Sequence, residues 1–169
     1  MIIRLSTLND IPAIMQLVAE VVPVMQASGN FQWDITYPNI KVFENDIKLN
    51  QLWVADVNGE IGGVTAITTD QSPEYAEVGW DITEPAIVTH RIAVSIHHHR
   101  QGIAKLLLQQ AEIVALNSGI KILRVDTNSN NKATRLLFPK LGYEFAGEIS
   151  LSRRPNLRFY CYEKLINLV

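Results

Sequence analysis

The sequence has little of what secreted, membrane-embedded or nucleic-acid-binding proteins need. Its single cysteine, Cys161, excludes a disulfide within the chain. No apolar run reaches the roughly 18 residues that span a bilayer, and the first residues lack the basic start and apolar stretch of a secretory signal. The net charge is −2, with no clustered basic face for nucleic acid. We therefore expect a cytoplasmic protein with no nucleic-acid or membrane partner.

Glycine and proline are also scarce, with 9 and 7 among 169 residues, which excludes collagen-like and linker-like chains. What the chain does contain is a core-forming mixture of 47% hydrophobic and 19% charged residues. No internal repeat or low-complexity tract interrupts it. We expect one domain that covers residues 1–169, because two domains would each be uncomfortably small.

Hydrophobic periodicity and turn signals predict strands mixed with helices. The expected strands are residues 2–6, 52–57, 61–69, 86–95, 121–127, 143–149 and 157–165, with a further extended piece at 75–81. The first expected helix begins near Ile11, and three further helices are expected at residues 39–49, 100–117 and 131–141. Pro23 should bend or end the first of these helices, because proline lacks the N–H that the helix interior needs.

This order predicts an α/β fold, with a central mixed sheet flanked by helices. The Asn58-Gly59 turn joins residues 52–57 and 61–69 in a hairpin, so much of the sheet is antiparallel. The strand–helix–strand unit between residues 86 and 127 predicts a right-handed crossover and one parallel pair of strands.

The most informative segment is VTHRIAVSIHHHRQGIAKLLL, residues 88–108, in which a buried strand leads through a loop into a helix. A helix N-terminus presents unpaired N–H groups and a positive partial charge. Gly102 lets a ligand approach the backbone, and Arg100 and Lys105 add positive charge, so the segment suits a pyrophosphate. The alternative is that Gly102 only permits close packing of the helix on the sheet.

Two motifs resemble those of the GCN5-related N-acetyltransferase (GNAT) superfamily, in particular its small bacterial-type members. Residues 92–94, IAV, followed by residues 99–104, HRQGIA, resemble the acetyl-coenzyme-A signature, with His99 where Gln or Arg is usual. Downstream, DTN at 126–128, NK at 131–132 and KLGYE at 140–144 resemble the later motif of the superfamily. The order of elements matches over nearly the whole chain.

The resemblance implies a GNAT-like acyltransferase fold, in which the two parallel strands splay apart and the pantetheine arm of acetyl-CoA lies in the gap. It implies that the Ile92 N–H polarises the thioester carbonyl and stabilises the oxyanion, and that Val94 pairs with the pantetheine. No metal is implied. The implied cosubstrate-binding residues are Ile92, Ala93, Val94, His99, Arg100, Gln101, Gly102, Ile103, Ala104, Lys105, Asn131 and Phe138.

The reaction also needs a group that takes a proton from the acceptor ammonium. Strand alternation predicts Val88, His90, Ile92 and Val94 on one face of the sheet. Some relatives carry a glutamate at the position of Val88, and another carries a histidine at the position of His90. His90 is therefore the first candidate for the base, through a water, and Glu77 is the second. The alternative is a structural histidine in a buried strand.

The residue that reprotonates the thiolate of coenzyme A is not evident from the sequence. The resemblance places Phe138 where relatives have a tyrosine for this step, and phenylalanine cannot donate a proton. Tyr160, Tyr162 or water could serve instead. The three adjacent histidines at 97–99 lack the spacing of a preformed metal site.

Substrate contacts are expected from the variable loop between the first two helices and from residues that precede the central strand. Aromatic faces with carboxylates suit a cationic amine, although aromatic residues also cap cores. The candidates are Phe31, Trp33, Asp34, Tyr37, Trp80 and Tyr160. We expect an N-acetyltransferase for a small amine, with a homodimer possible. The alternatives are a protein N-terminal or lysine acetyltransferase, and a non-catalytic acyl-CoA sensor.

Overall fold

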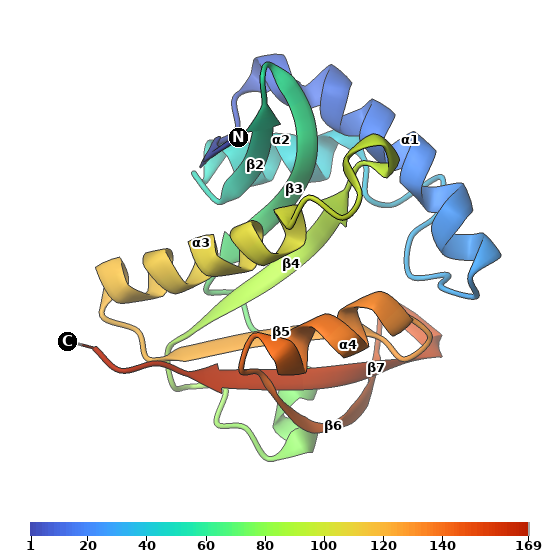
Figure 1. Ribbon diagram of the computed structural model, residues 1–169. Helices are drawn as coiled ribbons and strands as arrows, with labels where there is room; N and C mark the ends of the chain where they lie inside the picture. Colours follow the sequence, from blue (N-terminus) through green and yellow to red (C-terminus); the bar gives the residue numbers. More distant parts are fainter. Residues whose placement is uncertain (169) are drawn as a thin grey trace.

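Seven strands form one mixed sheet in the order β1-β2-β3-β4-β5-β7-β6 (Figure 1). The structure is a computed structural model that describes residues 1–168. Within these residues β4 and β5 are the one parallel pair, and the other neighbours are antiparallel. Figure 1 shows α3 and α4 in front of the sheet and α2 behind it. The expected α/β fold is confirmed.

The elements follow the chain in nearly the expected order. The strands are β1 Ile2–Leu5, β2 Leu52–Val57, β3 Glu60–Thr68, β4 Ala86–Val94, β5 Ile122–Asn128, β6 Glu144–Leu151 and β7 Arg154–Leu165. The α-helices are α1 Ile11–Ala27, α2 Ile40–Lys48, α3 Ile103–Ser118 and α4 Lys132–Lys140. The short 3-10 helices are η1 Leu8–Asp10, η2 Pro73–Val78 and η3 Ile96–His98.

The core lies on both faces of the sheet. On one face, α1 and α2 cover β2 and β3 through buried side chains such as Ile14, Phe43 and Val64. On the other face, α3 packs Leu107 against Ala55 of β2. Alternate residues of each strand point to opposite faces, so both layers can be apolar.

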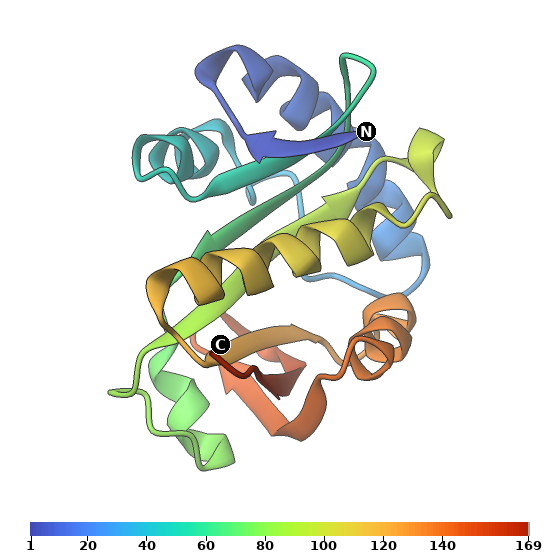
Figure 2. The ribbon, with the colours of Figure 1, turned by 60° about the vertical axis from the view of Figure 1, so that its left-hand side comes forward.

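The parallel pair separates along its length. Residues Ala86–Thr89 of β4 pair with Ile122–Val125 of β5, but β4 continues to Val94 against β3, and β5 continues to Asn128 against β7. Figures 1 and 2 both show the two strands close together at one end and apart at the other. The expected splayed pair is therefore present, and it leaves a slot in the middle of the sheet.

A β-bulge at Arg91 reverses the alternation of β4. His90 lies opposite Ala66 and Ala93 opposite Val64, so Thr65 alone faces both Arg91 and Ile92. Arg91 has a φ of 54°, a left-handed conformation that is costly for a residue with a side chain. The Thr65 hydroxyl donates a hydrogen bond of 3.0 Å to the His90 carbonyl at the same place.

The prediction that residues 88, 90, 92 and 94 share one face is therefore wrong. Val88 packs beside Tyr75 and Phe159, whereas Ile92 and Val94 pack against the start of α3 on the other face. The extra residue of the bulge shifts the two-residue period by one, which moves every later side chain across the sheet.

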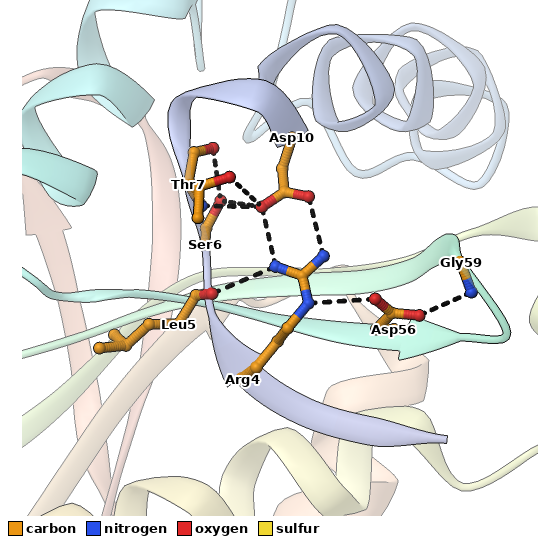
Figure 3. Close-up of polar contacts among 7 residues, drawn as sticks. All are labelled: Arg4, Leu5, Ser6, Thr7, Asp10, Asp56 and Gly59. Atoms are coloured by element: carbon orange, nitrogen blue, oxygen red, sulfur yellow. Dashed lines mark hydrogen bonds and ion pairs between the residues drawn. The ribbon is translucent and has the colours of Figure 1, made fainter.

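Arg4 ties the first strand to the entrance of α1 (Figure 3). Its guanidinium donates two hydrogen bonds of 2.9 Å to the Asp10 carboxylate and one of 3.0 Å to Asp56 of β2. Asp10 also accepts from the Thr7 backbone N–H at 2.7 Å, and Asp56 accepts from that of Gly59 at 2.7 Å. The network joins β1, the β2–β3 turn and η1.

Two local details differ from the predictions. Of the two effects predicted for Pro23, ending the first helix is wrong, because the helix continues to Ala27, where Val18 and Val21 anchor it on the sheet and offset the missing N–H. Residues 75–81 are not extended: Pro73–Val78 form η2, whose three-residue turn places Tyr75 and Val78 together in the core with Val88.

One segment, Leu8–Ala27, is long and apolar enough to cross a membrane by length and composition. By this criterion of length and composition, the expectation that no apolar run reaches the length of a membrane span was wrong. In the structure this segment contains η1 and α1, and Ile11, Ile14 and Leu17 are buried against the sheet. Its apolar stripe is therefore used as core.

Candidate active site

The loop before α3 forms a tight turn of exposed backbone. Arg100 and Gly102 both have positive φ angles, of 63° and 77°, with Gln101 between them. Gly102 is the N-cap of α3, and Lys105 is exposed in the first helical turn. The first N–H groups of a helix have no partner inside the helix, so this end can bind anionic oxygens.

Two glycines of β3 allow the start of α3 to pack closely against the sheet. A Cβ atom on Gly63 would lie 2.6 Å from the Ile103 Cγ2 atom and 3.1 Å from the Ala93 carbonyl oxygen. A Cβ atom on Gly62 would lie 2.8 Å from the Ile103 Cδ1 atom. Only glycine permits this close approach, so the buried Ile103 is part of the core rather than an exposed contact.

A mainly apolar groove runs along the separated end of β4. It is bordered by the C-terminal part of α1, residues 92–94 of β4, and α4. His99 and Ala104, at the turn before α3 and in its first turn, line the same groove. Asn131 also borders it and caps α4, accepting a hydrogen bond of 3.3 Å from the Thr134 N–H. The groove thus leads from the turn at Gly102 into the slot between the strands.

A more polar cleft adjoins the groove. Met25, Ile92, Asn131 and Thr134 line both. The cleft is bordered by α1, the 29–39 loop, β4, β5, α4 and the β6–β7 turn. Its ionisable lining residues are Tyr37, His90, Arg91, Asp126 and Arg153. The two depressions therefore meet beside the bulge of β4.

His90 enters the cleft as a neutral base. Its Nε2 atom lies 3.1 Å from the Asp70 carbonyl oxygen, which can only accept, so Nε2 carries the proton and Nδ1 keeps its lone pair. Burial lowers the pKa of His90, and the nearby Arg91 lowers it further, whereas Asp126 opposes these effects. Near neutral pH the imidazole is therefore uncharged and able to accept a proton.

Asp126 is held by a buried tyrosine from a distant part of the chain. The Tyr75 hydroxyl donates a hydrogen bond of 2.5 Å to Asp126 Oδ2. Tyr75 is fully buried, and burial beside the Asp126 carboxylate raises its pKa well above the ordinary value. Tyr75 therefore remains a proton donor that orients Asp126. Neither residue was predicted to belong to the site, and the only signal in the sequence was the place of Asp126 in the later motif.

The sequence matches the model of a known protein family over its central region. The profile of the Acetyltransferase (GNAT) domain family matches residues 48–145, more than half of the chain. The chain belongs to the GNAT acetyltransferase family. Its match covers β2 to the start of β6, and so includes the bulge, the turn at Gly102 and the slot between β4 and β5.

Solved acetyltransferase structures share the fold along nearly the whole chain. A GNAT family acetyltransferase from Streptococcus agalactiae is 26% identical with a TM-score of 0.78, covering 98% of this chain and 95% of that one. Ribosomal-protein-alanine N-acetyltransferase from Brucella melitensis is 19% identical with a TM-score of 0.70, covering 98% and 100%. The yncA protein from Salmonella typhimurium, solved with its cofactor acetyl-CoA, is 17% identical with a TM-score of 0.68, covering 99% and 94%.

The similarity to the Brucella melitensis and Salmonella typhimurium proteins shows only a shared fold. No curated protein matches the chain. Six of the twelve predicted cosubstrate residues line the groove, namely Ile92, Ala93, Val94, His99, Ala104 and Asn131. The other residues of the turn and of the first turn of α3, which are Arg100, Gln101, Gly102, Ile103 and Lys105, do not line it. Phe138 is fully buried at the cleft and packs against Tyr143 and Tyr162.

Two of the predicted substrate contacts lie in the cleft, namely Trp33 and Tyr37. Phe31 and Asp34 instead line a neighbouring groove, where Arg154 binds the Asp34 carboxylate at 2.8 Å. This ion pair lowers the pKa of Asp34 and leaves its charge matched. Asp34 is therefore not brought to the reaction centre.

The remaining two candidate substrate contacts and the second candidate base lie elsewhere on the molecule. Trp80 packs edge-on against Tyr75 with ring centroids 5.1 Å apart, and the Arg124 guanidinium lies over it at 4.6 Å. Tyr160 lines a separate groove with Phe145. Glu77 is exposed on η2 and does not line the cleft. The arrangement leaves His90 as the candidate base that the structure brings to the bulge.

Proposed function

We propose that this GNAT protein transfers the acetyl group of acetyl-CoA to the primary amine of a small molecule. The observation that carries the proposal is the meeting of an apolar groove and a polar cleft beside Ile92. Such an arrangement brings two reactants together from opposite sides of one peptide group, which is the main requirement of a direct transfer.

The chain offers complementary groups for acetyl-CoA. Free N–H groups at the start of α3, with the exposed Arg100 and Lys105, suit the diphosphate. The groove beside residues 92–94 of β4 suits the apolar and amide parts of the pantetheine arm, because β4 there has left β5. This fit agrees with the acetyl-CoA that yncA binds in the same fold.

The cleft supplies groups for the transfer. His90 accepts a proton from the acceptor ammonium, directly or through water, so that the amine nitrogen can attack the thioester carbon. The Ile92 N–H stabilises the oxyanion that results. As the carbon–sulfur bond breaks, the nitrogen gives its second proton to water, and coenzyme A leaves as a thiolate that takes a proton from water. The products are the amide and free coenzyme A, and His90 returns its proton to the solvent.

A small acceptor is favoured over a protein tail by the walls of the cleft. Three of these walls are α1, the 29–39 loop and the β6–β7 turn. Because elements from the whole length of the chain surround the cleft, it suits a compact ligand better than an extended peptide.

Phe138 favours one competing function, a sensor that holds acetyl-CoA without turnover. A buried phenyl ring at the cleft cannot return a proton to the thiolate. Coenzyme A thiolate needs no such donor when water reaches it, so we retain the enzyme as the proposed function. The two functions differ in a single measurable property, the release of thiol.

Two measurements test the proposal. Acetyl-CoA should raise the melting temperature of the protein, since a ligand that binds the native state stabilises it. A panel of small amines, peptides with free N-termini and lysine peptides should then release thiol fastest with a small amine. Absence of the thermal shift overturns acetyl-CoA binding. A shift without thiol release from any acceptor identifies the sensor.

A further inference from the structure

Two charged side chains of the cleft form no ion pair within the part of the chain that the structure describes. The histidine, carboxylate and guanidinium side chains that line the cleft are those of His90, Arg91, Asp126 and Arg153. The Arg91 guanidinium is matched by Asp46, with two hydrogen bonds of 2.8 Å. His90 is neutral for the reasons given above. One carboxylate and one guanidinium therefore remain to be matched, by a ligand or by solvent.

The carboxylate is that of Asp126. It is the one acidic side chain that lines the cleft within residues 1–168. Its recorded partner is the Tyr75 hydroxyl on Oδ2, and no Lys or Arg of the described chain forms an ion pair with it. Tyr75 fixes one oxygen and leaves the other for a donor. A primary ammonium, with three N–H donors and a positive charge, is its natural complement.

The guanidinium is that of Arg153, in the turn between β6 and β7. Arg153 is exposed and forms no ion pair with residues 1–168, whereas its neighbour Arg154 binds Asp34. Arg153 lies over the ring of Tyr37, another cleft residue, at 5.8 Å. Arg153 also adds to the lowering of the pKa of His90 and opposes the rise in the pKa of Tyr75. It therefore borders the cleft while it remains exposed.

We propose that Asp126 and Arg153 select an acceptor that carries an anionic group as well as its amine, such as an amino acid or an aminoalkyl phosphate. Asp126 binds the ammonium near His90, and Arg153 binds the carboxylate or phosphate at the mouth of the cleft. Guanidinium groups pair with both kinds of anion through parallel N–H donors. This inference rests on the proposed acetyl transfer and adds the chemical class of the acceptor.

The test compares matched acceptors that differ only in the anionic group. One series is an amino acid, its amide and the corresponding decarboxylated amine; the other is phosphoethanolamine and ethanolamine. We expect kcat/KM to be at least roughly tenfold higher for an anionic member than for its neutral partner, the size of one charge-assisted hydrogen bond. The series that shows this preference identifies carboxylate or phosphate as the anion. Equal kcat/KM values within both series overturn the proposal.

Two variants at residue 153 test the residue assignment. Arg153→Gln should abolish the preference by raising KM for the anionic acceptor roughly tenfold more than KM for its neutral partner. Arg153→Glu should reverse the preference toward neutral and cationic amines, which is a gain that misfolding cannot imitate. The matched control is Arg158→Gln, an exposed arginine of β7 that pairs with Glu148 outside the cleft. A preference that survives both substitutions at residue 153 overturns the role of Arg153.

Asp126→Asn should raise KM for every amine while the thermal shift with acetyl-CoA stays unchanged. If that KM does not change, the role of Asp126 is overturned. Calorimetric titration of the same acceptors into the protein with bound coenzyme A measures their affinities without turnover. Tighter binding of anionic amines with no thiol release would overturn the proposed transfer and keep this inference, whereas turnover with no charge preference would do the reverse.

Discussion

Asp46 of α2 and Arg91 of the β4 bulge form a two-pronged ion pair, with Nε and Nη2 of the guanidinium each 2.8 Å from a carboxylate oxygen. Asp46 is 4% exposed, and the Arg91 guanidinium also donates to the Tyr37 hydroxyl at 3.3 Å. The pair joins α2 to the residue whose φ of 54° turns Ile92 to the groove side of the sheet. It thereby connects the packing of α2 with the geometry of the site.

Removal of one partner of this pair should therefore cost both stability and turnover. We expect Asp46→Asn to lower the free energy of unfolding by about 3 kcal/mol, because it leaves the Arg91 charge unmatched. Urea denaturation measures this loss. The double variant Asp46→Asn with Arg91→Gln removes both charges and should recover at least half of it. A loss below about 1 kcal/mol in the single variant would show that solvent already screens the pair.

The pH dependence of turnover should report His90. Because burial and Arg91 lower the pKa of His90, the imidazole is protonated only below its ordinary value of 6.5. The kcat of the native protein should therefore be flat near neutral pH and fall at lower pH as the base becomes charged. His90→Gln should remove this acidic limb and lower kcat by roughly 100-fold.

The matched control for His90 is Glu77→Gln, at an exposed residue outside the cleft. It should leave both the rate and the pH profile near those of the native protein. If the acidic limb persists in His90→Gln and disappears in Glu77→Gln, the base is Glu77. If neither substitution moves it, water or the substrate carries the proton.

The Arg4–Asp10 pair should make stability depend on pH in the acidic range. Hydrogen bonding to Arg4 lowers the pKa of Asp10 from 3.8 to about 2. The folded-state pKa is depressed, so the contribution is complete above about 4 and is lost as the pH falls toward 2. Arg4→Gln should cost about 1 to 2 kcal/mol at pH 7, and the difference from the native protein should narrow between pH 4 and pH 2. A constant difference across this range would contradict the assignment.

Gly63 should be intolerant of a side chain, with an effect on cosubstrate binding. The Cβ atom of Gly63→Ala would lie 2.6 Å from the Ile103 Cγ2 atom, so the start of α3 must shift. We expect a loss of stability of about 1 to 3 kcal/mol and weaker binding of acetyl-CoA, measured by denaturation and calorimetry. Adding Ile103→Leu, which moves the branch away from Cβ, should restore part of both. Unchanged affinity in Gly63→Ala would mean that the turn at Gly102 is positioned independently of β3.

Local patterns in the sequence predicted most of the elements, with residues 75–81 as an exception, and they also predicted a turn suited to a diphosphate before α3. The Asn58-Gly59 turn, the apolar strand before Ser95 and the glycine that opens α3 each act over a few neighbouring residues, so each could be recognised in isolation. The family motifs added the splay of β4 from β5, which the register of the two strands confirms.

The acceptor side could be predicted only in part. Trp33, Tyr37 and His90 do line the cleft, but Asp34 is withdrawn by Arg154, and Glu77 lies outside it. The carboxylates of Asp34 and Glu77 suited a cationic amine or a base by residue type alone, which says nothing about where the fold places them. Which partner a charged side chain finds depends on segments that are distant in the sequence, and Arg154 follows Asp34 by 120 residues.

By itself, the sequence determined the order of strands and helices, the turn that suits a diphosphate and the membership of an acetyltransferase family, because these follow from short-range periodicity and motif spacing. Only the tertiary structure decided that an extra residue at Arg91 turns Ile92 and Val94 away from the face of Val88. It also decided that Tyr75 orients Asp126 from 51 residues away. Both depend on packing between distant segments, which sets burial and charge and leaves no local pattern along the chain.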